Sequence, residues 1–244
     1  MGAHLHPKPI AVEAPVALEV NGIGLAVMMA TPEALEDFAV GFAVAEGLLR
    51  DAGAIEGLDA VEVRDGWIVR LRVGGVSREA ALARARTRVT ESACGLCGAE
   101  SLAQVARALP RVTRPMAPTH AALRAAMAAL PERQAMGRRT RATHAAALCD
   151  ADGAIRLIRE DVGRHNALDK LVGGALRAGE PMEGRFALVT SRLSYELVEK
   201  AVRAGLGALA ALSAPTSMAL ARAKAAGLPV VAPARALAPE PPSA

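Results

Sequence analysis

Two cysteines, Cys94 and Cys97, are separated by only two residues in the run ESACGLCGAE at 91–100. The chain holds three cysteines in all, so this pair concentrates its thiol chemistry in one short segment. Glycines at 95 and 98 predict a mobile loop that can offer sulfur to a partner. The pair fits four interpretations: half of a zinc site, a dithiol redox pair, a persulfide carrier, or an incidental pair.

The surroundings of the pair favour the persulfide carrier. A structural zinc site takes four ligands, as a rule from two such pairs, and the remaining candidates, Cys149, His144 and His165, are scattered along the chain. We therefore predict no zinc. A thioredoxin-type pair stands at a strand-to-helix turn early in its fold, whereas this one lies mid-chain. A persulfide carrier needs an exposed thiolate, which the positive charges at 84, 86 and 88 favour.

A second cluster of chemistry-bearing residues lies between Arg159 and Lys170. Asp161, His165 and Asp169 are spaced by four, so they share one helix face if the helix begins early. Carboxylates on either side of an imidazole fix its tautomer and favour its protonated form. A capped helix with ordinary salt bridges explains the spacing equally well, and both interpretations stay open on the sequence alone.

Two loops rich in hydroxyl groups form a third feature. Each follows a predicted strand and opens a predicted helix, so in a parallel sheet both loops lie at the carboxyl edge, where ligands bind. Hydroxyls, an arginine and free helix N-terminal N–H groups suit a phosphate, although helix capping alone also explains the Ser and Thr. The expected phosphate contacts are Ser191, Arg192, Ser194, Thr216 and Ser217, and Asp161, Arg164 and His165 are expected to line the same pocket.

The elements that must position these residues fall into two parts. In 14–130, hairpins at 16–29 and 61–73 surround a helix that opens at Thr31-Pro32, and a helical stretch covers 120–130. In 140–236, strands and helices alternate, which predicts an α/β fold with a parallel or mixed sheet between helices. We expect the first part to be a smaller N-terminal α+β lobe that ends in the cysteine loop and its following helices, the second to be a cofactor-binding core, and 237–244 to be a disordered tail. The strands of the second part are expected at 143–149, 154–159, 186–189, 208–212 and 229–231, and its helices at 164–177, 194–204 and 215–226.

Composition narrows the partners and the compartment. The net charge of +4 in 244 residues, with 2% aromatic residues, gives no basic stripe with stacking side chains, so no nucleic-acid partner is predicted. The uncharged run 204–221 reaches the length of a membrane span, but its glycines, proline and hydroxyl residues predict a buried strand, loop and helix instead. Three cysteines without an export signal indicate reduced thiols in the cytoplasm.

Taken together, these segments resemble the formate dehydrogenase accessory sulfurtransferases (the FdhD family) over about residues 14 to 232. This resemblance implies a three-layer, cytidine-deaminase-like core, in which Ala146 stands where a deaminase has its acid/base glutamate. Deamination is therefore not expected. The motifs that carry the resemblance are 31–42 (TPEALEDFAVGF), 94–98 (CGLCG), 143–147 (THAAA), 160–170 (EDVGRHNALDK), 191–196 (SRLSYE) and 213–217 (SAPTS).

The resemblance also implies a function. The family takes sulfur from a cysteine desulfurase and passes it to the molybdenum bis(molybdopterin guanine dinucleotide) cofactor, its bound substrate, which activates formate dehydrogenase. Cys94 matches the persulfide-bearing residue, and Cys97 is the second thiol. The C-terminal cofactor motif is reduced here to Arg235, and Arg141 replaces a usual glycine. The alternative is a non-catalytic chaperone that binds the cofactor for the dehydrogenase, and a second copy of the chain is an optional partner.

Overall fold

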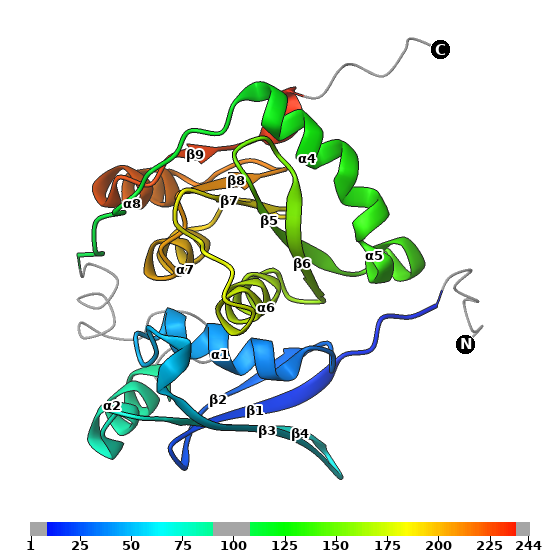
Figure 1. Ribbon diagram of the computed structural model, residues 1–244. Coiled ribbons are helices and arrows are strands. Elements are labelled where there is room, and N and C mark those ends of the chain that lie inside the picture. The colour runs from blue at the N-terminus through cyan, green and yellow to red at the C-terminus, as the bar shows by residue number, and fades with distance from the viewer. Residues whose placement is uncertain (1–8, 90–107, 238–244) are drawn as a thin grey trace.

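The computed structural model describes residues 9–89 and 108–237, which form two β-sheets with helices packed between and around them (Figure 1). The first sheet has the strand order β2-β1-β4-β3, and the second has the order β6-β5-β7-β8-β9. Each sheet contains both parallel and antiparallel pairs. The predicted mixture of helices and strands is therefore confirmed at the level of an α/β protein with mixed sheets.

The first sheet is built from the two predicted hairpins. Asn21 and Gly22 turn the first hairpin with positive φ angles of 50° and 74°, as a two-residue hairpin turn requires. β1 then pairs with β4 in parallel, which joins the hairpins into one sheet. The side chains alternate, so Val16, Leu18 and Val20 of β1 face the core. The strands are β1 (Ala14–Val20), β2 (Ile23–Ala30), β3 (Ile55–Val63) and β4 (Gly66–Val73), with the short helix η1 (Ala52–Ala54) before β3.

The helix α1 (Leu35–Ala45) follows the first hairpin, but it begins later than its sequence predicts. Thr31 is not its N-cap, because Ala34 precedes the helix with a φ of 52° and no side-chain cap bond is present there. The Thr31 hydroxyl instead accepts the backbone N–H of Val162 at 3.2 Å. The expected cap is therefore wrong, and Thr31 serves a contact across the molecule.

The second sheet follows the predicted alternation closely. β7 and β8 are parallel, as are β8 and β9, whereas β5 runs antiparallel to both of its neighbours. The strands are β5 (His144–Cys149), β6 (Ile155–Asp161), β7 (Phe186–Val189), β8 (Ala208–Ala211) and β9 (Val230–Val231). After β4 of the first sheet comes α2 (Arg78–Val89). The helices that accompany the second sheet are α4 (His120–Arg133), α5 (Ala135–Thr140), α6 (Arg164–Arg177), α7 (Tyr195–Arg203) and α8 (Ser217–Ala226), and η2 (Ala234–Leu237) follows β9.

Helices cover both faces of the second sheet. α6, α7 and α8 share a core with one face, through residues such as Leu168, Leu197 and Ala223. α4 packs on the opposite face, where Leu123 joins Leu188 and Phe186 in a second apolar cluster. The sequence predicts the 120–130 helix as part of the N-terminal lobe, whereas the buried side of this helix lies against the second sheet (Figure 1).

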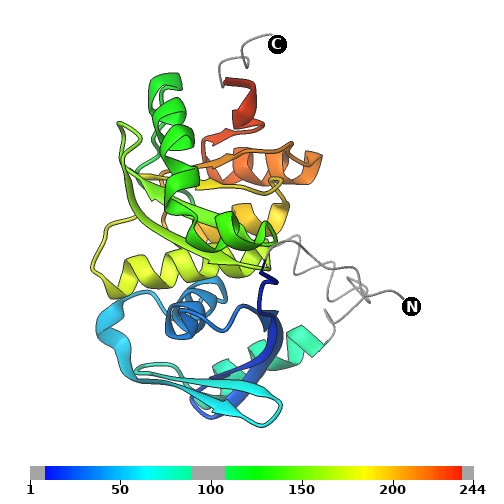
Figure 2. The same ribbon diagram turned by 90° about the vertical axis from the view of Figure 1, so that its right-hand side faces the viewer.

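The two sheets are joined by a close crossing of α1 and α6 (Figure 2). A Cβ atom added to Gly41 would lie 1.8 Å from the carbonyl oxygen of Asp169, and one added to Gly173 would lie 1.9 Å from that of Asp37. Only glycine lets two helix backbones approach this closely. One apolar core therefore runs from the first sheet through these helices to the second.

Candidate functional site

The topology of the second sheet brings the predicted loops to one edge. β6 and β7 both run antiparallel to β5, and β8 is parallel to β7, so all three strands end at the same side. The loops after β7 and β8 lie next to each other: the N–H of Leu193 donates to the oxygen of Ala214 at 3.1 Å, and that of Thr216 donates to the oxygen of Leu193 at 3.0 Å. The expected juxtaposition of the two hydroxyl-rich loops is thus present.

Hydroxyl groups at this edge have different roles. Thr216 caps α8, because its Oγ1 accepts the N–H of Ala219 at 3.2 Å. Ser194 stands at the N-cap of α7 without such a bond, and the buried Ser191 hydroxyl donates to the carbonyl oxygen of Arg192 at 3.0 Å. Ser217 is exposed at the start of α8. Capping thus accounts for Thr216, whereas Ser194 contacts His165 and Glu196 and the exposed Ser217 is available for a ligand.

His165 links the first turn of α6 to the first turn of α7. Its Nε2 lies 3.3 Å from Ser194 Oγ and 3.1 Å from Glu196 Oε2. The hydrogen bond with His165 lowers the pKa of Glu196 to about 2, against an opposing effect of burial. The carboxylate beside the imidazole is therefore Glu196. Asp161 and Asp169, the carboxylates expected beside His165, each pair with a lysine, which agrees with the alternative of ordinary salt bridges.

Asp161 forms a completely buried ion pair with Lys170, at 2.6 Å. The same carboxylate accepts the N–H of Thr31 at 3.0 Å, the N–H of Gly163 at 2.7 Å and the side-chain amide of Asn166 at 3.0 Å. Four donors therefore surround it. A cofactor contact from Asp161 remains a prediction; in the structure this residue positions the start of α6 against the loop before α1.

Positive charge gathers at the same edge. Arg192 is exposed in the loop after β7, and Arg164 is half-buried at the start of α6. The pKa of His144, at the start of β5, is lowered first by burial and then by Arg164 and His165. The lowered pKa favours the neutral form of His144. An anionic group placed here would meet Arg164, Arg192 and the N-termini of two helices.

Three predicted site residues are not placed by the structure. Cys94 and Cys97 lie outside the described residues, as does the side chain of Arg235, whose backbone belongs to η2. The remaining cysteine, Cys149, is buried in β5, and burial raises the pKa of its thiol to about 12. A thiol of this kind is a poor nucleophile near neutral pH.

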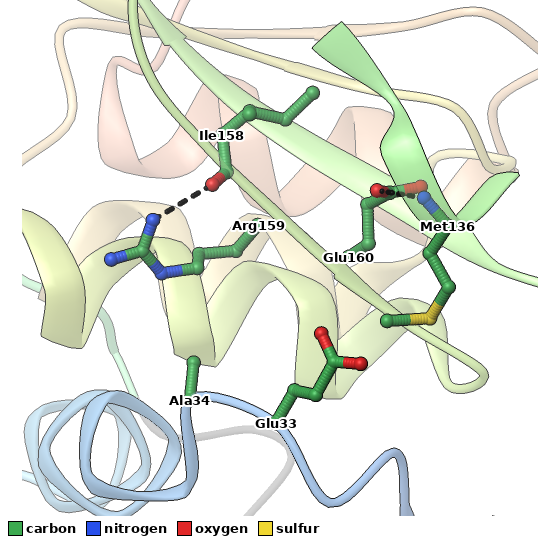
Figure 3. Close-up of a pocket in the computed structure, with 6 residues that line it drawn as sticks. All are labelled: Glu33, Ala34, Met136, Ile158, Arg159 and Glu160. Carbon is green, nitrogen blue, oxygen red and sulfur yellow. Dashed lines mark hydrogen bonds between the residues drawn. The ribbon is translucent and has the colours of Figure 1, made fainter. Parts of the chain in front are cut away.

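Two hollows in the described part of the chain lie away from these loops. One, of about 260 Å³, is lined by Glu33, Met136, Arg159 and Glu160, among others, and the carboxylate of Glu160 accepts the N–H of Met136 (Figure 3). The same carboxylate also accepts the N–H of Gly137. The other, of about 410 Å³, lies among the ends of α1, α6 and α7. Neither is lined by a predicted phosphate contact.

Residues 9–89 and 108–237 contain neither a cluster of metal ligands nor a helix that could span a membrane. Within these ranges, no three His, Cys, Asp or Glu side chains are grouped as metal ligands would be. Since Cys94 and Cys97 fall in the gap, the predicted lack of zinc is untested. No helix in the same ranges has the length and apolar character needed to span a bilayer.

Comparison with known proteins decides the family. The model of the FdhD/NarQ family matches residues 11–240. The chain belongs to this family. A relative from Variovorax paradoxus (strain S110), named "Sulfur carrier protein FdhD", is 48% identical over 219 residues, which are 90% of this chain and 79% of the relative. A relative of the same name from Cupriavidus necator is 45% identical over 225 residues, 92% of this chain and 78% of its own.

One solved structure has a similar fold. The chain superposes with a TM-score of 0.70 on the crystal structure of a putative formate dehydrogenase accessory protein from Desulfotalea psychrophila, at 24% identity. The superposition covers 92% of this chain and 84% of that one. Both β-sheets fall within the residues that the FdhD/NarQ family model matches.

Sequence reasoning missed two residues beside the candidate site, Glu196 and Lys170. Glu196 belongs to the 191–196 motif, where its position in the first turn of a helix after Ser194 was the available signal. Lys170 closes the 160–170 motif, but a lysine in an amphipathic helix ordinarily points to solvent. Its burial against Asp161 follows from tertiary packing.

Proposed function

We propose that this protein is a sulfur carrier that serves formate dehydrogenase. The observation that carries the proposal is the similarity, at 42–48% identity over about nine-tenths of the chain, to relatives named "Sulfur carrier protein FdhD". A sulfur carrier needs a nucleophilic thiol, and the buried Cys149 is unsuited to that role. The role therefore falls to Cys94 and Cys97, which lie inside the family match.

In the proposed reaction a cysteine desulfurase supplies the sulfur. The Cys94 thiolate attacks the outer sulfur of the desulfurase persulfide, an S–S bond forms on Cys94, and the desulfurase cysteine leaves as its thiolate. Attack by Cys97 on the Cys94 persulfide would then release sulfide and leave a disulfide. The two thiols thus divide into a carrier and a resolving or relay group, and the reaction belongs in the cytoplasm, where thiols stay reduced.

The proposed acceptor is the molybdenum cofactor in its guanine dinucleotide form, bound as a substrate at the carboxyl edge of the second sheet. Exposed Arg192 and half-buried Arg164 supply charge, and Ser194 and Ser217 stand at the N-termini of α7 and α8. These are groups that bind phosphate. Thr216, Ser191 and Arg235 are proposed to complete the surface, and the helices on both faces of the sheet support a cytidine-deaminase-like layout.

Intact mass after incubation with a desulfurase and cysteine tests the carrier. We expect one added sulfur of about 32 Da on the Cys94 peptide. Cys94→Ala should abolish the adduct, and Cys149→Ala is the matched control that should retain it, because Cys149 is buried in β5. Full labelling of the Cys94→Ala protein would refute the assignment.

Titration with a guanine nucleotide tests the acceptor site. Loss of one charge-assisted contact in Arg192→Ala should cost about 1.5–3 kcal/mol, or roughly ten- to a hundredfold in affinity. Arg156→Ala removes an exposed arginine at the other end of β6 and should leave the affinity unchanged. Equal affinities of wild type and Arg192→Ala would exclude this site.

Zinc and the chaperone alternative each have a direct test. Elemental analysis should find no stoichiometric zinc, because a metal-bound Cys94 could not carry sulfur. A Cys94→Ala protein that still activates formate dehydrogenase would support a chaperone that holds the cofactor without transferring sulfur. We expect no activation by that variant.

A further inference from the structure

The hollow of about 410 Å³ among the ends of α1, α6 and α7 lies at the other edge of the second sheet from the hydroxyl-rich loops. Met182 and Glu183 line it just before β7 begins, and Gly205 lines it just before β8 begins. The hollow therefore stands at the amino edge of these parallel strands. α7 connects the two edges, from Ser194 at its N-cap to Arg203 in its last turn, which is about 14 Å along the helix axis.

The floor of the hollow is apolar and belongs to the core. Val44 of α1, Leu49 after that helix and Val202 of α7 line it, and all three are buried. The chain before α4, which passes beside α8 in Figure 1, forms a further wall. Its position is fixed by the N–H of Val112, which donates to the carbonyl oxygen of Ala226 at 3.0 Å. The walls are therefore formed without a ligand, as is usual for small-molecule sites.

Three arginines, Arg50, Arg111 and Arg203, also line the hollow. Arg203 is half-buried, and Arg50 and Arg111 are exposed. Within residues 9–89 and 108–237, none of the three side chains forms an ion pair or a hydrogen bond. An unpaired guanidinium is the group that binds a carboxylate, a sulfonate or a phosphate through two parallel hydrogen bonds. The hollow therefore combines an apolar floor with unpaired positive charge.

The guanidinium of Arg203 lies near a second one from α2. A Cβ atom added to Gly47 would lie 3.4 Å from Nη1 of Arg203 and 3.6 Å from Nη2 of Arg84. Two like charges therefore converge on the glycine turn after α1, which lines the hollow. The negative end of α7 accounts for a cation in its last turn, but Arg84 lies in the middle of α2 and Arg50 lies outside any helix. Helix ends therefore do not explain the whole cluster.

One carboxylate, that of Glu183, lines the same hollow. An oxygen of Glu183 accepts the hydroxyl of Thr113 at 3.0 Å, and the exposed carboxylate has its other oxygen left for a donor on a ligand. Three arginines against one glutamate leave the lining positive. The charges therefore suit a ligand with an anionic group at one point and a hydrogen-bond donor at another.

We propose that this hollow binds a small organic anion that has an apolar body. The anionic group is held by Arg203 and Arg50, and the body lies against the floor at Val44 and Val202. Pockets of about 300–1,000 Å³ hold ligands of drug size, and the volume of about 410 Å³ falls in that range. The site is separate from the proposed cofactor site and does not depend on sulfur transfer.

Fluorescence titration of the full chain with anilinonaphthalene sulfonate tests the site, because this probe joins a sulfonate to an aromatic body and fluoresces when it leaves water. Wild type should bind one molecule of the probe saturably. Arg203→Ala should raise the Kd roughly ten- to a hundredfold, since one charge-assisted contact is lost. Arg203→Lys keeps the charge without the planar fork and should have an intermediate Kd. Arg124→Ala removes an exposed arginine of α4 outside the hollow and is the matched control, with an unchanged Kd.

Two further measurements separate this hollow from other binding places. Ala204→Phe fills the hollow, which Ala204 lines, while every arginine stays in place, so it should abolish binding of the probe with unchanged circular dichroism. Excess guanine nucleotide should not displace the probe, because the proposed phosphate contacts lie at the other end of α7. A Kd that is unchanged in Arg203→Ala, an equal rise in Arg124→Ala, full binding to Ala204→Phe, or displacement by the nucleotide would each overturn the proposal.

Discussion

The pair formed by Asp161 and Lys170 places two opposite charges where neither side chain is exposed. Burial lowers the pKa of Lys170, and the ion pair with Asp161 opposes that shift. Desolvation of such a pair is offset only when every remaining donor and acceptor is satisfied. Lys170 also donates to the carbonyl oxygen of Thr31 at 2.8 Å, and its Nζ lies 5.9 Å from the centroid of the Phe38 ring.

Removal of one partner should therefore be costly. Lys170→Met leaves the Asp161 carboxylate buried without its cation, and we expect a loss of about 3–5 kcal/mol in the free energy of unfolding, measured in urea. The double variant with Asp161→Asn should lose less than the sum of the two single variants. A Lys170→Met protein as stable as wild type would contradict the role given to this pair.

The contact between Glu196 and His165 predicts a pH dependence. The pKa of Glu196 is lowered from 4.5 to about 2 in the folded protein, so the unfolded chain binds the proton more readily. The contribution to stability is complete above pH 4.5 and disappears as the pH falls towards 2. Comparison with Glu196→Gln should show a difference in unfolding free energy that shrinks as the pH falls from about 4.5 towards 2. Since the side chain is 42% exposed, the difference should be small; a difference that grows with acid would refute this account.

Much of the candidate site could be predicted at the residue scale, because spacing and strand order suffice to bring Ser191, Arg192 and Thr216 to one edge. The partner of His165 could not. From the sequence, either Asp161 or Glu196 could contact His165. The packing of α6 against α7 brings Glu196 to His165, and this packing cannot be predicted from local sequence.

The crossing of α1 and α6 is the contact between helices that joins the two sheets. We expect Gly41→Ala to destabilise the fold by about 2–3 kcal/mol or more, because the added methyl meets the backbone oxygen of Asp169. Thermal unfolding measures the effect. Gly24→Ala, where an added Cβ meets no atom within 4 Å, is the control and should change little; equal effects of the two substitutions would argue against a tight crossing.

Local patterns predicted most elements but not their long-range pairing. Hairpin turns, the 3.6-residue period and Gly or Pro boundaries are local signals, and they locate α6 at Arg164–Arg177 and β7 at Phe186–Val189 as observed. The parallel pairing of β1 with β4 and the packing of α4 on the second sheet join residues far apart in the chain. Thr31 misled the prediction because Thr-Pro is a good helix start, yet a tertiary contact uses its hydroxyl.

The continuous core predicts that the whole molecule unfolds as one unit. Trp67, the sole tryptophan, lies in β4 and reports on the first sheet, whereas far-ultraviolet circular dichroism is dominated by helices that flank the second. Because one apolar core joins both sheets, the two signals should give coincident transitions in denaturant. If the fluorescence transition occurs at a lower denaturant concentration than the circular dichroism transition, the first sheet unfolds separately.

Both polar groups of the Thr31 backbone are held at the contact between the two halves. Its N–H donates to Asp161 and its carbonyl accepts from Lys170, so its amide proton can reach water only when α6 and the entry to α1 separate. The rate of hydrogen–deuterium exchange at this one amide would therefore measure how often the two sheets separate. If this amide exchanges only as fast as the whole protein unfolds, the two halves do not separate in the folded state. If it exchanges faster, the halves separate while each remains folded.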